Sequence, residues 1–162
     1  MLKDKVLKAL NAQINAEMFS EYLYLSMAAW FESKNWLGFA RWMKIQAGEE
    51  RGHAMRLYDY IHLAGGQVLL DAIKAPSTEW ASPLAAFEDA YRHEQSITAK
   101  IHDLVKLAAA EGDVATGIML QWFVTEQMEE EATAGQIVAQ LKLIGDNTNG
   151  LFMMDRELGK RE

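Results

Sequence analysis

The stretch Glu49-Glu50-Arg51-Gly52-His53 places a carboxylate and an imidazole three residues apart. On a helix, Glu50 and His53 lie on one face, about one turn from each other. Sevenfold spacing puts large apolar residues above and below both side chains, so this face is expected to be buried. The rows are Met43-Glu50-Leu57 and Phe39-Gln46-His53-Tyr60. A buried charge must be compensated, and the pair predicts either metal binding in a helical bundle or a Glu–His hydrogen bond without metal.

Polar residues also interrupt apolar rows in three other helix-periodic stretches: Glu17 and Tyr24, then Glu94, then Gln127 and Glu130. The rows are Leu10-Glu17-Tyr24-Phe31, Phe87-Glu94-Ile101-Ala108, Leu120-Gln127-Ala134-Leu141 and Phe123-Glu130-Ile137-Ile144. A sevenfold row drifts by only ~20° per step on a straight helix, so each row stays on one side. Because every one of these polar residues lies near the middle of its helix, we expect them to meet at one level of the core.

Four carboxylates and one imidazole at the same depth favour bound cations. A single inward glutamate is usually a hydrogen-bonded core residue, but four together would repel one another and lose their hydration. Cations bridged by carboxylates would satisfy the whole set. Oxygen-rich ligands with one imidazole suit iron or manganese, whereas structural zinc prefers sulfur and several imidazoles.

The elements that must position these groups are helices, expected over residues 4–32, 36–64, 83–111 and 114–143, with a short fifth helix over 148–158. Gly65-Gly66 ends the second, Ser82-Pro83 starts the third, and Gly112 with Asp113 separates the third from the fourth. Short turns within each pair and a long link between the pairs predict an all-α four-helix bundle with one long crossover connection.

Composition narrows the class further. With 162 residues, 50% of them hydrophobic, the chain is expected to form a single domain over residues 1–162. A net charge of −7 disfavours nucleic acid and anionic membranes as partners. There is no cysteine, which excludes disulfides and thiolate metal sites. No apolar run approaches the ~18 residues of a membrane span, and residues 1–8 are too charged for a signal peptide, so a cytoplasmic protein is expected.

The set Glu17, Tyr24, Glu50-x-x-His53, Glu94 and Gln127-x-x-Glu130 resembles that of the bacterial and archaeal non-haem ferritins, and the similarity extends over essentially the whole chain. The resemblance implies a ferritin-like domain that assembles as a homo-oligomeric cage of 24 subunits. It also implies iron storage and detoxification: a ferroxidase centre within each subunit oxidises Fe(II) to Fe(III) with O2 or H2O2, and ferric mineral accumulates inside the cage.

The same resemblance implies a ligand set for a di-iron centre. Glu17, Glu50 and His53 would bind one iron, and Glu50, Glu94 and Glu130 the other, so that Glu50 bridges the two ions.

A neighbouring third iron site of the family matches Glu49, Glu126 and Glu129, with Glu130 shared. A run of glutamates is otherwise typical of a solvated helix face. Glu49 also lies on a row with Arg56, so an internal Glu49–Arg56 ion pair is the alternative to metal binding there.

The fourth helix departs from related families. Bacterioferritins and other di-iron carboxylate proteins repeat Glu-x-x-His there, whereas this chain has Gln127-x-x-Glu130, so a centre that passes iron on is expected rather than a retained cofactor. By the resemblance, Gln127 and Tyr24 would lie beside the ligands, and Tyr24 could donate an electron. Haem is not expected, because Gly52 stands where bacterioferritins place the haem-binding methionine.

Two rival functions make different predictions. A rubrerythrin-like di-iron peroxidase would turn over peroxide with a reductant and form no mineral, but the chain lacks rubredoxin-type cysteines and a second Glu-x-x-His. A non-catalytic scaffold, whose polar core only specifies helix register, would bind no metal.

Overall fold

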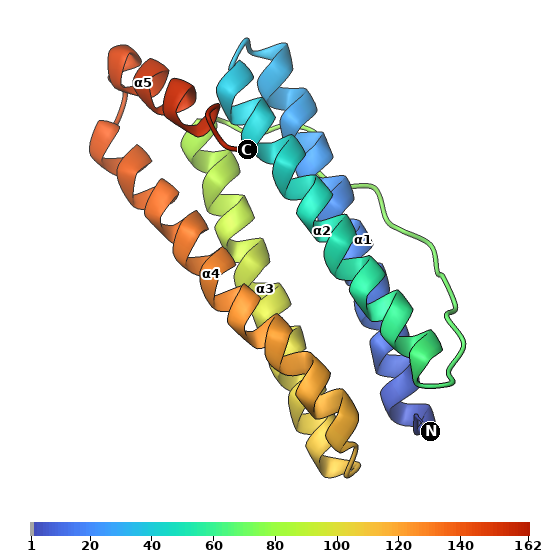
Figure 1. Cartoon of the computed structure of the whole chain (residues 1–162). Coiled ribbons are helices and arrows are strands. Elements are labelled where there is room, and N and C mark those ends of the chain that lie inside the picture. Colours follow the sequence, from blue (N-terminus) through green and yellow to red (C-terminus); the bar gives the residue numbers. More distant parts are fainter. Residues whose placement is uncertain (1) are drawn as a thin grey trace.

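The computed structural model describes residues 2–162. Within that range the chain forms five helices and no strand, which confirms the expected all-α class (Figure 1). The helices are α1 (Asp4–Ser33), α2 (Leu37–Leu63), α3 (Pro83–Ala110), α4 (Val114–Ile144) and α5 (Thr148–Leu158). No helix among these residues has the length and apolar character needed to cross a membrane.

The four long helices form two antiparallel hairpins, α1–α2 and α3–α4, packed side by side (Figure 1). The segment between α2 and α3 runs the length of the bundle, so α3 starts at the end opposite to the end of α2. This is the four-helix bundle with one long crossover that the turn lengths predicted.

Local chemistry sets the helix ends. The Ser82 hydroxyl oxygen accepts a hydrogen bond from Ala85 N at 3.1 Å, and Pro83 follows in the first helical position of α3. Asp113 caps α4 in the same way, because its Oδ1 accepts from Thr116 N at 3.0 Å. Gly112, at φ +67°, makes the tight turn that reverses the chain between α3 and α4.

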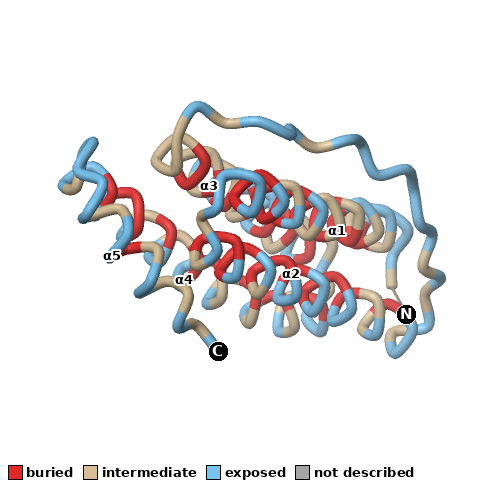
Figure 2. Tube along the Cα trace, turned by 90° about the horizontal axis from the view of Figure 1, so that it is seen from above, coloured by how far each residue is buried: buried red, intermediate tan, exposed pale blue. Residues whose placement is uncertain are grey.

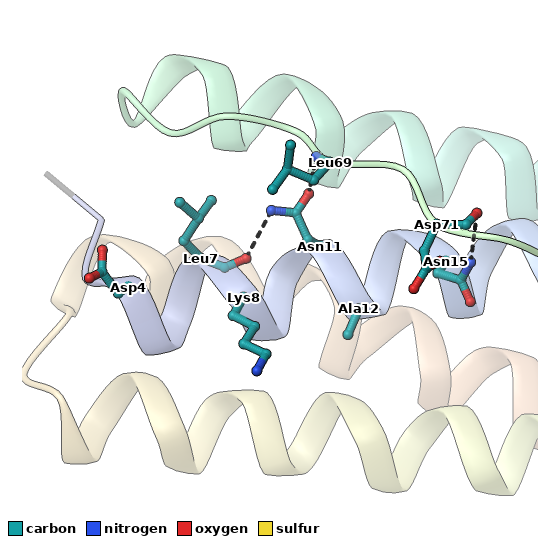
Figure 3. Close-up of a pocket in the computed structure, with 8 residues that line it drawn as sticks. All are labelled: Asp4, Leu7, Lys8, Asn11, Ala12, Asn15, Leu69 and Asp71. Atoms are coloured by element: carbon teal, nitrogen blue, oxygen red, sulfur yellow. Dashed lines mark hydrogen bonds between the residues drawn. The ribbon is translucent and has the colours of Figure 1, made fainter.

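The crossover segment is held on α1 by two asparagine side chains (Figure 3). Asn11 Oδ1 accepts from Leu69 N at 2.8 Å, and its Nδ2 donates to Gln67 O at 3.1 Å. One turn further along α1, Asn15 Nδ2 donates to Ala72 O at 3.0 Å. An exposed segment without helix or strand is thereby given partners for part of its backbone.

Buried residues lie on the facing sides of α1–α4, whereas the crossover segment is mostly exposed (Figure 2). Within residues 2–162 the apolar ones form two clusters. One surrounds Phe31, Phe39 and Phe87, and the other surrounds Leu57 and Phe123. On every long helix a buried glutamate lies between these clusters, with buried alanines as the apolar neighbours on α2 and α4, so a polar layer divides the apolar interior in two.

Helix α5 docks on its own bundle at the start of α2. Phe39 N donates to Asp155 Oδ1 at 2.9 Å, which gives a carboxylate partner to a free N–H at the positive end of α2. Met154 is buried, and Gly159 packs against Gly38. A Cβ on Gly38 would overlap the main-chain carbonyl of Asp155, so this contact requires glycine.

We predict that Gly38→Ala destabilises the protein by about 1–3 kcal/mol, because the new methyl group must displace backbone rather than a flexible side chain. The matched control is Gly48→Ala on the same helix, where no described atom outside the local helix lies within 4 Å of the added Cβ. There the change should stabilise by up to about 1 kcal/mol, since alanine favours a helix interior. Thermal unfolding of both variants measures the difference. Equal midpoints would contradict the close α2–α5 contact.

Candidate metal centre

All four long helices contribute a glutamate to the polar layer. Glu17 comes from α1, Glu50 from α2, Glu94 from α3 and Glu130 from α4, and His53 lies one turn beyond Glu50. Each of the five side chains is at most 8% exposed. The heptad rows explain this arrangement, because each helix turns the same face inward above and below its acidic residue.

The ligand atoms converge in overlapping sets of three. Glu17, Glu50 and His53 each offer an atom within 4.8 Å of the others, and so do Glu50, Glu94 and Glu130. Glu50 belongs to both sets, so a bridging position between two ions is available to it. These sets coincide with the two ligand groups that the sequence resemblance implies.

Uncharged donors hydrogen-bond at least one oxygen of each carboxylate. Gln13 Nε2 donates to Glu17 Oε1 at 2.8 Å. Gln46 Nε2 donates to Glu130 Oε2 at 2.6 Å and to Glu50 Oε1 at 3.2 Å, so one amide connects two helices.

On α3, Glu94 has two such partners. The Tyr24 hydroxyl donates to its Oε1, and Gln127 Nε2 donates to its Oε2 at 3.1 Å. The expected positions of Tyr24 and Gln127 beside the carboxylate layer therefore agree with the geometry.

Two buried oxygens remain without a hydrogen-bond partner among residues 2–162: Glu17 Oε2 and Glu130 Oε1. Leaving a buried carboxylate oxygen unpaired is costly, because its hydration is lost and nothing replaces it. Glu17 and Glu130 belong to different sets of three, and these two sets share Glu50. An ion bound in each set would give each orphaned oxygen a partner, so the donor set fits two cations.

Burial also changes the protonation of the layer. It raises the pKa of Glu17 to about 7 and, together with the negative charge of Glu94, raises the pKa of Glu130 to about 8. The pKa values of Glu50 and Glu94 are raised as well, chiefly by burial and, for Glu50, also by the neighbouring carboxylates.

Burial lowers the pKa of His53 to about 4, with a smaller effect of the Arg56 charge. The imidazole is therefore neutral near pH 7, as a metal ligand must be. Its Nδ1 lies 3.2 Å from Glu50 Oε2, and its Nε2 lies 3.7 Å from Glu126 Oε1.

The three outer carboxylates differ from one another. Glu126 is half-buried and forms a third possible ligand set with His53 and Glu130. Burial and the charges of Glu129 and Glu49 raise the pKa of Glu126, so Glu126 is close enough to interact electrostatically with both. Glu129 is exposed.

The Glu49–Arg56 ion pair expected as an alternative is wrong. Glu49 Oε2 instead pairs with the guanidinium of Arg161 at 2.7 Å, near the C-terminus. The guanidinium carbon of Arg56 lies 4.1 Å from the centre of the Trp122 ring, so Arg56 is turned toward an aromatic face on α4.

Sequence reasoning assigned no role to Gln13, Gln46 or Arg161. The two glutamines precede Glu17 and Glu50 by four residues, the spacing at which helix side chains meet, and this repeated pattern is a signal that could have identified them. Arg161 carries no such signal, because its contact depends on how α5 docks.

The fold and the buried acidic layer together define a class: ferritin-like four-helix bundles with a carboxylate-rich interior. Comparison with known proteins gives the same result. A family model described as "Ferritin-like domain" matches residues 7–144.

Two relatives are bacterial non-heme ferritins. That of Bacteroides fragilis (strain 638R) is 47% identical over 161 residues, covering 99% of this chain and 100% of the relative. That of Staphylococcus epidermidis is 40% identical and covers 99% and 97%, respectively. A solved open pore ferritin from the archaeon Archaeoglobus fulgidus superposes with a TM-score of 0.99 at 49% identity over 100% of both chains. The chain belongs to the ferritin family of iron-storage proteins.

We predict that the metal-free protein loses stability as the pH rises from 6.5 to 8. In this window folded Glu130 keeps a proton that the unfolded chain has released, so raising the pH favours the unfolded state, by at most about 1.4 kcal/mol per pH unit for each such group. Below pH 6.5 the trend is partly offset by His53, whose pKa is lowered to about 4 in the folded protein. There the unfolded chain binds a proton that folded His53 does not, so the folded protein becomes more stable as the pH rises toward 6.5.

Thermal midpoints in the presence of a chelator test this. Glu130→Gln should flatten the decline, and Glu129→Gln, which changes an exposed carboxylate of the same helix, should not. Parallel pH profiles for wild type and Glu130→Gln would count against the protonated layer.

Proposed function

We propose that this iron-storage protein oxidises Fe(II) at a centre within each subunit and deposits the ferric product inside a hollow homo-oligomer. The observation that carries the proposal is the pair of orphaned oxygens, Glu17 Oε2 and Glu130 Oε1, in two ligand sets that share Glu50. Hydrogen bonds among residues 2–162 leave both atoms free, and two cations would give each of them a partner.

In this proposal Glu17, Glu50 and His53 bind one Fe(II), and Glu50, Glu94 and Glu130 bind the other. Because Glu17 and Glu130 hold protons up to about pH 7 and 8, iron binding displaces protons from the layer. Because protons leave as the cations bind, the net charge of the buried layer changes little. This lowers the free-energy cost of bringing cations into the apolar interior.

Two Fe(II) ions supply two electrons, and either O2 or H2O2 takes them up: O2 with two protons gives H2O2, and H2O2 with two protons gives two waters. Carboxylates are hard oxygen donors and favour the ferric product. Full reduction of O2 to two waters takes four electrons and four protons; three Fe(II) ions would supply three of these electrons, and Tyr24, hydrogen-bonded to Glu94, would supply the fourth together with its phenolic proton. The glutamine amides hold the carboxylates by hydrogen bonds without adding charge.

A third iron site on Glu49, Glu126 and Glu129, with Glu130 shared, would lie on the path away from the centre. The raised pKa of Glu126, caused first by burial and then by the charges of Glu129 and Glu49, supports this grouping. Beyond it, Glu129 and Glu131 would offer carboxylates on which hydrated ferric oxide can nucleate.

Assembly into a cage of 24 subunits accounts for large apolar side chains that a single chain leaves exposed. Val114 and Ile118 at the start of α4 are 72% and 70% exposed, Leu143 at its end is 88% exposed, and Met153 on α5 is 73% exposed. Apolar groups gathered at both ends of a helix are typical of surfaces covered by other subunits.

We predict that replacing Glu50 and His53 together by alanine lowers the initial rate of Fe(II) oxidation at least about 100-fold, because both ions lose ligands and several kcal/mol of charge stabilisation. Stopped-flow absorbance after mixing with aerobic Fe(II) measures the rate. The control is the double variant Asp59→Ala/His62→Ala, an exposed acid–histidine pair at the same spacing on the same helix. Comparable rates in the two double variants would reject the site.

We also predict that metal-free protein binds two Fe(II) per chain at the centre in the absence of oxygen. A third Fe(II) per chain should bind when the third site is also occupied. Aerobic loading should then produce electron-dense cores within shells whose mass corresponds to 24 chains. Isothermal titration, size-exclusion light scattering and electron microscopy measure the three quantities. Peroxide turnover with a reductant and no core would favour the peroxidase reading, and no uptake at all would favour a scaffold.

A further inference from the structure

The C-terminal tail (residues 159–162) lies along α2 and reaches the edge of the metal centre. The tail begins where α5 docks on α2, at the contact between Gly159 and Gly38. One turn further along α2, Arg41 Nε donates to the main-chain oxygen of Arg161 at 3.2 Å. The Arg161 guanidinium carbon lies 4.5 Å from the centre of the Trp42 ring.

The Arg161 guanidinium makes two side-chain hydrogen bonds on α2. Its NH2 group donates to Glu49 Oε2 at 2.7 Å, and its NH1 group donates to Gln46 Oε1 at 2.9 Å. The amide of the same glutamine donates to Glu130 and Glu50. Arg161 is therefore one side chain away from the buried carboxylates and in direct contact with Glu49.

Glu49 cannot serve the guanidinium and a metal ion equally well at the same time. The carboxylate oxygen that faces Arg161 carries a charge-assisted hydrogen bond, and a cation bound there would bring two positive groups against each other. Glu49 is 43% exposed and Arg161 22% exposed, so water can replace either partner. The ion pair can therefore break and re-form readily.

We propose that Arg161 competes with metal for Glu49. Docking of the C-terminal tail and metal binding at the third iron site, called the outer site below, then oppose each other. Arg161 is a positioning residue, which holds Glu49 away from the ions until iron arriving from the inner centre displaces the guanidinium. This inference rests on the proposed function, because it assigns Glu49 to the outer site. Coupling between two binding events is reciprocal, so iron at Glu49 must loosen the tail as much as the tail weakens iron there.

The neighbouring cation offers a matched control. Lys160 pairs with Glu157 at 2.9 Å, and both of these side chains are 68% exposed. Replacing Lys160 removes the same charge from the same tail without touching Glu49 or Gln46.

The first test is calorimetric titration of the metal-free assembled protein with Zn(II), a probe that cannot be oxidised. Arg161→Gln should lower the dissociation constant of the outer ion roughly fivefold, the upper range for an exposed ion pair. Lys160→Gln should leave it within about twofold. In a Glu49→Gln background, Arg161→Gln should have no further effect on this dissociation constant, because the carboxylate for which Arg161 and the metal compete is absent.

The second test follows the tail itself by hydrogen exchange of residues 156–162. Saturating Zn(II) should increase exchange there in wild type and in Lys160→Gln. In Glu49→Gln the tail should exchange faster from the start, with no further change on adding Zn(II). Unchanged tail exchange in zinc-saturated wild type would overturn the proposal.

The outcomes separate this inference from the proposed function. If wild type binds no inner ions, the ferroxidase centre is wrong and this inference is lost with it. If the inner ions bind but Arg161→Gln matches Lys160→Gln at the outer site, only the competition is wrong. If Arg161→Gln instead weakens the inner ions, Arg161 acts through Gln46 on Glu130, and the competition is again rejected.

Discussion

The structure depends on one constraint: four carboxylates share a buried layer that has too few donors to satisfy them. Three glutamine amides, one histidine and one tyrosine reach the layer, yet two oxygens among the described residues remain unpaired. The neighbours above and below the layer are aliphatic and aromatic, so they cannot supply the missing hydrogen bonds. The bundle around the layer is ordinary helix packing, and the layer is the part whose hydrogen-bonding needs the described residues leave unmet.

The connectivity of the chain explains why the site spans four helices. Each hairpin brings two carboxylates. The set of Glu17, Glu50 and His53 lies within the α1–α2 hairpin, whereas the set of Glu50, Glu94 and Glu130 forms only when the two hairpins pack together. The long crossover lets α3 start at the end of the bundle where α1 ends, and asparagines on α1 guide that segment. The caps at Ser82 and Asp113 then fix where α3 and α4 begin and which residues face inward.

Much of this follows from local rules. Sevenfold rows predicted which faces turn inward, because helix periodicity is a property of the backbone and tertiary contacts only complete it. Glycines and capping residues placed the helix ends within one residue of those observed. The partner of Glu49 did not follow, since the row suggested Arg56, whereas Arg56 packs on Trp122 and Arg161 arrives from a segment more than 100 residues away. Such a contact depends on the docking of α5 and on the space at Gly38, which no periodic pattern encodes.

The polar layer also has a mechanical consequence. By dividing the apolar interior, it separates the bundle into two compartments that share helices but little side-chain contact, so fluctuations at one end need not spread to the other. Ions bound at this layer would link all four helices, in addition to the hydrogen bonds that already cross it. We expect metal binding to raise the cooperativity of unfolding, because the ions would couple the two apolar compartments.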